Sequence, residues 1–75
     1  MNRSYEVNNS SNIKKVEFLD THDIVRITFK GGQIYNYKGV KAPDKKALEE
    51  ACKKDEHVGT VFGQYIRPYY KGLKI

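Results

Sequence analysis

The chain has 75 residues, a net charge of +5 and one cysteine, Cys52. A chain of this length forms at most one domain with a small core. One cysteine cannot form an internal disulfide, and two isolated histidines do not make a zinc site. No apolar run is long enough to span a bilayer and no signal peptide is present. We therefore expect a protein of the cytoplasm, in a bacterial cell or phage-infected host, with no membrane contact, metal or cofactor.

The positive charge is concentrated in two parts of the chain. Residues 10–41 carry six Lys and Arg against three Asp and Glu, which gives +3. Residues 57–75 carry three cations and no acid, again +3, whereas residues 42–56 carry four cations and five acids, −1. Such a distribution is typical of a face that binds an anion, for which nucleic acid or a nucleotide is the obvious choice. A basic surface without a specific partner has the same charge balance.

Two strands are predicted in the first half of the chain, at residues 13–19 and 24–30. The second strand alternates apolar and polar residues, as a half-buried strand does. Residues 20–23 are turn formers by composition. A four-residue turn there pairs Phe18 with Val25, and this pairing places the apolar residues of both strands on one face.

A third strand is predicted at residues 33–38, after the hairpin signal Gly31-Gly32. A two-residue turn places Arg26 opposite Tyr37 and puts Tyr35 on the same open face of the sheet. A three-residue turn shifts the pairing by one residue and sends both tyrosines to the core face instead. We take the two-residue turn as the expectation and keep the other as an alternative.

Two helices are predicted in the second half. Pro43 and Asp44 suit the first turn of a helix over residues 43–54. A second apolar stripe with helical spacing runs from Val58 to Ile66. Pro68 ends this second helix.

The predicted fold class is α+β: a three-stranded antiparallel β-meander followed by one or two helices packed on one face. Residues 1–9 are polar and without periodicity, so we expect them to form a flexible N-terminal arm. The domain covers residues 10–70, and residues 71–75 are a basic tail.

The order of several short motifs resembles the KTSC domain. Ser-Ser-Asn-Ile is followed by a strand, by Gly-Gly-x-x-Tyr-x-Tyr, by a helix, and by Gly-x-x-Phe and Ile-Arg-x-x-Tyr. The matching positions are Ser11, Asn12, Ile13, Gly32, Tyr35, Tyr37, Val40, Gly59, Phe62, Ile66 and Tyr69. The resemblance implies a module associated with nucleic acid, RNA above all. The chain departs from the family pattern at three places: the stretched connector 40–43, the acidic residues 55–56, and Gly63. The resemblance therefore implies a related ligand rather than an identical one.

Eight residues are candidates for contacting a ligand. Tyrosine rings stack on nucleobases whatever the sequence, and the arginine fork suits phosphate. Hydroxyl and amide groups before a strand can donate to an anion or a base edge. The same residues can also be structural, as half-buried tyrosines or as local bonds to the backbone. The candidates are Ser11, Asn12, Arg26, Tyr35, Tyr37, Tyr65, Arg67 and Tyr69, with Arg67 foremost.

These features predict a binding protein without catalytic activity, because no nucleophile, base or metal ligands converge in the sequence. The expected ligand is an anionic nucleic acid or nucleotide, with RNA implied by the resemblance. One alternative is a phage anti-defence sponge that sequesters a cyclic nucleotide in the pocket of a homo-oligomer. Another is a module that docks on a host protein through the apolar stripe of residues 58–66.

Overall fold

A computed structural model describes residues 2–75 and shows five strands and several helical segments. The 3-10 turn η1 follows β2, and η2 is a π-helical continuation of α2. In chain order the elements are β1 (Asn2–Glu6), β2 (Ile13–Leu19), η1 (Asp20–His22), β3 (Ile24–Phe29), β4 (Ile34–Lys38), α1 (Ala42–Lys54), α2 (Val58–Val61), η2 (Phe62–Ile66) and β5 (Gly72–Lys74).

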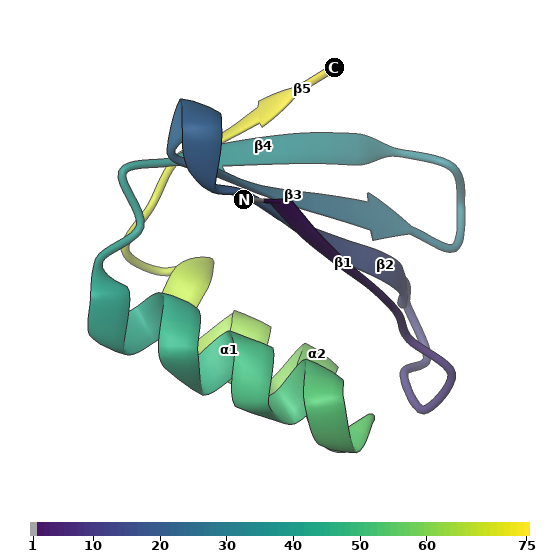
Figure 1. The fold of residues 1–75 in the computed structure, drawn as a ribbon. Helices are drawn as coiled ribbons and strands as arrows, with labels where there is room; N and C mark the ends of the chain where they lie inside the picture. Colours follow the sequence, from purple (N-terminus) through teal and green to yellow (C-terminus); the bar gives the residue numbers. More distant parts are fainter. Residues whose placement is uncertain (1) are drawn as a thin grey trace.

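The strands form one antiparallel sheet in the order β1-β2-β3-β4-β5 (Figure 1). The α+β class is therefore confirmed, but the predicted three strands are two too few. The predicted flexible arm contains β1, which pairs with β2 along its full length. The predicted tail contains β5, which returns after the helices and pairs with β4.

Side-chain contacts hold β1 on the domain. Arg3 donates to the carboxylates of Glu49, in α1, and Asp20, in η1. Tyr5 donates its hydroxyl to the same Glu49 at 2.6 Å and packs its ring edge-on against Phe18, with centroids 5.9 Å apart. These partners lie far away in the sequence, so the polar composition of the segment does not reveal them.

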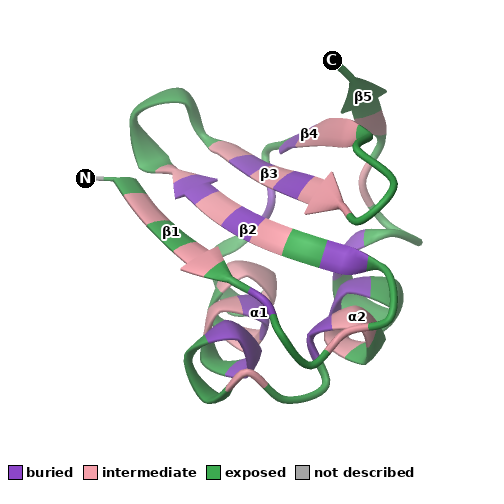
Figure 2. Ribbon diagram, turned by 90° about the vertical axis from the view of Figure 1, so that its right-hand side faces the viewer, coloured by how far each residue is buried: buried purple, intermediate pink, exposed green. Residues whose placement is uncertain are grey.

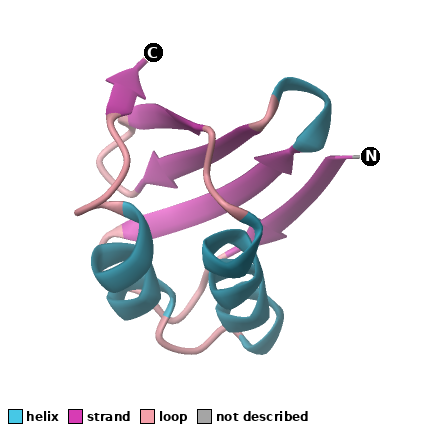
Figure 3. Ribbon diagram, turned by 90° about the vertical axis from the view of Figure 1, so that its left-hand side faces the viewer, coloured by secondary structure: helices cyan, strands magenta, loops and turns pink. Residues whose placement is uncertain are grey.

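The helices cover one face of the sheet and leave the other open, which makes a two-layer domain (Figure 3). Buried residues alternate with more exposed ones along the central strands, and both helices also contain buried residues (Figure 2). The largest fully buried residues are Phe18, Ile13, Ile27, Leu48, Ile66, Val16, Val25 and Val58. Three residues of the apolar stripe predicted for residues 58–66, Val58, Phe62 and Ile66, are thus buried in the core.

The first hairpin has the predicted register, with Phe18 opposite Val25. The second hairpin, between β3 and β4, does not have the expected register. Val25 faces Tyr37, Ile27 faces Tyr35, and Arg26 faces Asn36. The expected two-residue turn is therefore wrong, and the alternative with both tyrosines on the core face is the one the chain adopts.

A three-residue loop over residues 30–32 produces this shift. The amide of Phe29 donates to the carbonyl of Gln33 at 2.8 Å, so the closing pair uses Phe29 in place of Lys30 and β3 ends one residue earlier than expected. Gly32 has a φ of 96°, whereas Gly31 has no positive φ. This is the pattern of a three-residue hairpin with one glycine in a positive-φ position. Because the register buries the ring of Tyr37, the core gains a large aromatic side chain.

Both helices form where the sequence predicted them, over Ala42–Lys54 and from Val58 to Ile66. Two residues with positive φ, Asp55 and His57, make the sharp connection between them. The Asp55 carboxylate accepts hydrogen bonds from the amides of Asn8 and Asn9 at 3.0 and 3.2 Å. The connection therefore holds the loop between β1 and β2 beside the start of α2.

Candidate functional site

A hollow opens where β3, β4, β5 and the second helix meet. We call it the aromatic pocket; its volume is about 470 Å³. It lies between the sheet and η2 and takes residues from both ends of the domain. Its lining residues are Asn12, Phe29, Gln33, Tyr35, Tyr37, Gly59, Phe62, Gly63, Arg67 and Lys74.

Four rings in edge-to-face contact line this pocket. Phe29 and Tyr35 lie 5.8 Å apart between centroids, Phe29 and Phe62 6.0 Å, and Tyr37 and Phe62 5.4 Å. Tyr37 and Phe62 are buried, with 6% and 4% of their surface exposed. Phe29 and Tyr35 are only half-buried. The latter two therefore offer ring surface to a ligand, while the buried pair supports them from below.

Two cations stand at the rim of the aromatic pocket. Arg67 follows η2 directly, and Lys74 lies in β5 opposite Tyr35. Both side chains are exposed, and neither forms an ion pair within residues 2–75. Burial raises the pKa of Tyr37, and the positive charge of Arg67 opposes part of that rise. The pocket thus combines an aromatic lining with positive charge that no carboxylate of the described chain neutralises.

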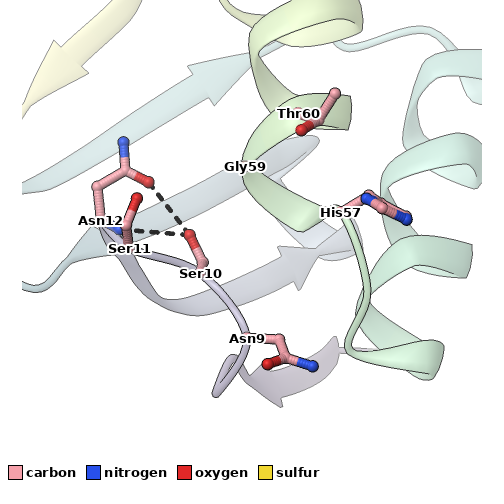
Figure 4. Close-up of a pocket in the computed structure, with 7 residues that line it drawn as sticks. All are labelled: Asn9, Ser10, Ser11, Asn12, His57, Gly59 and Thr60. Atoms are coloured by element: carbon pink, nitrogen blue, oxygen red, sulfur yellow. Dashed lines mark hydrogen bonds between the residues drawn. The ribbon is translucent and has the colours of Figure 1, made fainter.

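A second hollow of about 390 Å³ adjoins the first, between the loop before β2 and the start of α2 (Figure 4). We call it the polar pocket. Asn12 and Gly59 line both hollows. Its lining residues are Asn9, Ser10, Ser11, Asn12, His57, Gly59 and Thr60.

Ser10 has a structural role in the polar pocket. Its Oγ donates to Oδ1 of Asn12 at 3.1 Å (Figure 4). The same Oγ accepts from the amide of Ile13 at 3.1 Å. A Cβ on Gly59 would lie 3.3 Å from that Oγ, so glycine allows the helix to start close against the loop. The hydroxyls of Ser11 and Thr60, by contrast, make no hydrogen bond within residues 2–75, and both residues are exposed.

A comparison with protein-family models matches residues 9–70 to the KTSC domain. The chain belongs to the KTSC domain family. The match covers most of the chain and confirms the resemblance seen in the sequence. It excludes β1 and β5, and therefore Lys74. A search of curated proteins finds no match to this KTSC domain.

The structure brings together five of the eight predicted site residues. Tyr35, Tyr37 and Arg67 line the aromatic pocket, Ser11 lines the polar pocket, and Asn12 lines both. Tyr37 is too buried to stack on a base, which differs from the role expected of it.

The other three predicted residues lie elsewhere. Arg26 is on the open sheet face, where its Nε donates to Asn36 at 2.9 Å. Tyr65 lines none of the pockets found in the described chain. Tyr69 is 74% exposed beside Lys41 and Asp44, at a separate hollow. The shift of the β3–β4 register is what separates Arg26 from the tyrosines.

Sequence reasoning missed several residues of the two pockets as site candidates. Lys74 was assigned to a tail, and only the pairing of β5 with β4 places it here. Phe29 belongs to the predicted strand over residues 24–30, and His57 lies between the two predicted helices, so neither position suggested a ligand contact. The Gly-x-x-Phe motif of the family resemblance was the available signal, because Gly59 and Phe62 both line the aromatic pocket.

Two further features are absent from the described part of the chain: a cluster of metal ligands and a membrane-spanning helix. Within residues 2–75, no three His, Cys, Asp or Glu side chains gather as metal ligands do. None of the helices described is long and apolar enough to cross a membrane.

Proposed function

We propose that this KTSC domain is a non-catalytic binding protein for an anionic nucleic acid or nucleotide, which it holds in the aromatic pocket. The observation that carries the proposal is the combination of two cations without ion pairs, Arg67 and Lys74, and four aromatic rings in one hollow. Aromatic surface accepts any base, and exposed cations bind phosphate. RNA is the polymer that the family suggests.

The exposure of each side chain indicates its role in the aromatic pocket. Phe29 and Tyr35 present ring surface on which a base can stack. Arg67 offers a planar fork that can bind two phosphate oxygens, and Lys74 adds a point charge. Tyr37 and Phe62 serve as the packed support under the accessible rings.

The size of the pocket favours a second candidate, a small nucleotide bound on its own. A volume of about 470 Å³ lies within the usual range for small-molecule sites. A cyclic nucleotide sequestered by a homo-oligomer, as a phage anti-defence sponge would do, is therefore the alternative. A polymer binder tolerates changes in ligand length, whereas a sponge binds one small nucleotide stoichiometrically and forms a defined oligomer.

The test is binding of labelled single-stranded RNA, measured by fluorescence anisotropy, with the variants Arg67→Gln and Arg26→Gln. Each variant lowers the net charge by one, but Arg26 lies on the opposite face of the sheet from the helices. We expect Arg67→Gln to weaken binding roughly ten- to hundredfold, because a charge-assisted hydrogen bond contributes about 1.5–3 kcal/mol. Arg26→Gln should have little effect, and wild-type affinity should fall as salt rises.

Equal effects of the two substitutions would show that only overall charge matters and would refute this site. A thermal-shift screen against cyclic dinucleotides distinguishes a nucleic-acid binder from a cyclic-nucleotide sponge. The elution volume of each complex is measured in parallel. A melting temperature raised only by a cyclic dinucleotide, with a defined oligomer, would favour the sponge.

A further inference from the structure

We propose that the polar pocket is a second subsite that binds the neutral sugar or base edge of the neighbouring nucleotide. The inference rests on the proposed function and deepens it. The ligand unit is then a linear dinucleotide: one nucleotide lies in the aromatic pocket with its phosphate at Arg67 and Lys74, and the next nucleoside lies between the loop before β2 and the start of α2.

The two pockets adjoin each other. Asn12 and Gly59 line both, so the hollows meet at these residues. At the junction the loop packs closely against Gly59, where a Cβ would lie 3.3 Å from Ser10 Oγ and 3.5 Å from Asn12 Oδ1, and Ser10 holds the Asn12 side chain there at 3.1 Å. Figure 4 shows residues 9–12 facing the start of α2 across the polar pocket. A linear ligand with one unit in the first pocket would therefore pass over this junction to place its next unit in the second.

The chemistry of the two pockets differs in the way that a nucleotide strand requires. The aromatic pocket carries both cations. The lining of the polar pocket contains no Lys, Arg or carboxylate; beside the imidazole of His57 it presents the amides of Asn9 and Asn12 and the hydroxyls of Ser11 and Thr60. Neutral donors and acceptors suit ribose hydroxyls and base edges, which carry no charge.

The hydroxyls of Ser11 and Thr60 are available for this role. Neither forms a hydrogen bond within residues 2–75, and they come from opposite sides of the pocket. By contrast, the Ser10 hydroxyl is fully engaged in fixing the loop. Ser11 and Thr60 are therefore the residues to substitute, because their hydroxyls, unlike that of Ser10, take no part in holding the loop.

The test compares three linear ligands by calorimetry, in series with each of the four bases: a nucleoside 5′-monophosphate, the 3′,5′-bisphosphate, and the 5′-phosphorylated dinucleotide. The dinucleotide differs from the bisphosphate by its second nucleoside. We expect the dinucleotide to bind wild type about tenfold more tightly than the bisphosphate, the gain of one or two net hydrogen bonds. The double variant Ser11→Ala, Thr60→Val should lose that gain and still bind the bisphosphate normally.

Two controls keep the outcomes separate. Arg67→Gln should weaken all three ligands, and Ser11→Ala with Thr60→Ser should recover part of the gain, since one hydroxyl remains. If wild type binds the bisphosphate and dinucleotide equally, or the double variant weakens both alike, the second subsite is refuted and the proposed function stands. If wild type binds none of the ligands with any base, both proposals fail.

Discussion

At the scale of single residues, the position of the Tyr37 ring depends on Gly72. The two residues face each other in the β4–β5 ladder. A Cβ on Gly72 would lie 2.6 Å from Cζ of Tyr37 and 2.8 Å from its hydroxyl oxygen. No protein tolerates such a contact without movement, so any side chain here must displace the ring or detach β5. Glycine at this position thus allows the buried tyrosine and the last strand to coexist.

We predict that Gly72→Ala lowers the free energy of unfolding by about 1–3 kcal/mol, the usual cost of overpacking. Urea denaturation measures it. Gly63→Ala is the matched control: its Cβ meets nothing within 4 Å and it lies within a helix. That substitution should leave stability unchanged or raise it by up to about 1 kcal/mol. An unchanged free energy in Gly72→Ala would contradict the packing described.

The same scale shows what sequence reasoning could and could not predict about the site. The residue types of Arg67, Asn12 and Tyr35 already suggested ligand contacts, and the fold places them at one hollow. The face on which Tyr35 lies was not predictable, because one residue of loop length decides it. Lys74 was not predictable either, because its position depends on a strand pairing between residues far apart in the sequence.

At the scale of elements, β1 shows how a polar segment becomes a strand. Its inward-facing residues are Arg3 and Tyr5, which do not read as a buried pattern. Their partners, Glu49 and Asp20, are supplied by α1 and η1. Strand formation here is a tertiary effect, so the composition of residues 2–6 predicted an arm. The central hairpin and both helices were predictable because their own apolar spacing specifies them.

The Arg3–Glu49 contact makes stability depend on pH. Burial raises the pKa of Glu49, but hydrogen bonds from Arg3 and Tyr5 outweigh this effect and hold it below the ordinary value of 4.5. Because the pKa of Glu49 is lower in the folded than in the unfolded protein, the ionised carboxylate stabilises the fold at every pH above its unfolded-state pKa. This stabilisation is lost as the pH falls through the folded-state pKa, where the carboxylate becomes protonated. We predict that the stability difference between wild type and Glu49→Gln is constant above about pH 5 and shrinks below it.

Unfolding by urea at a series of pH values measures this difference. Glu50→Gln is the control, since exposed Glu50 makes only a 3.8 Å ion pair with Lys53. It should change the free energy of unfolding by less than about 0.5 kcal/mol. Parallel pH curves for wild type and Glu49→Gln would show that the carboxylate does not anchor β1.

At the scale of the whole molecule, one core joins the sheet and the helices, and Cys52 lies inside it. Its side chain is 5% exposed. Burial, with smaller contributions from the charges of Glu49 and Asp55, raises the pKa of this thiol to about 12. The thiolate is the reactive form, so the folded protein protects Cys52 both by access and by protonation.

We predict that Cys52 reacts with a thiol reagent at neutral pH only when the whole domain unfolds. The labelling rate should rise with urea in parallel with the equilibrium unfolding curve. A Lys46→Cys variant in a Cys52→Ala background should react at once, because residue 46 is exposed. A Cys52 labelling rate that does not respond to low urea would reveal local opening around α1 instead.

The three residues between β3 and β4 have a consequence for the whole domain. Side chains alternate along a strand, so which face a residue of β4 joins depends on whether the connection before it has an odd or even number of residues. With three, Tyr35 and Tyr37 join the ligand-facing side and Ile34 and Asn36 the open side. Had the same chain closed with a two-residue turn over residues 31–32, Ile34 and Asn36 would lie on the ligand-facing side, and the pocket would lose the rings of Tyr35 and Tyr37. The chemical identity of this surface is thus encoded partly in a count of residues, in a loop that lines no part of it.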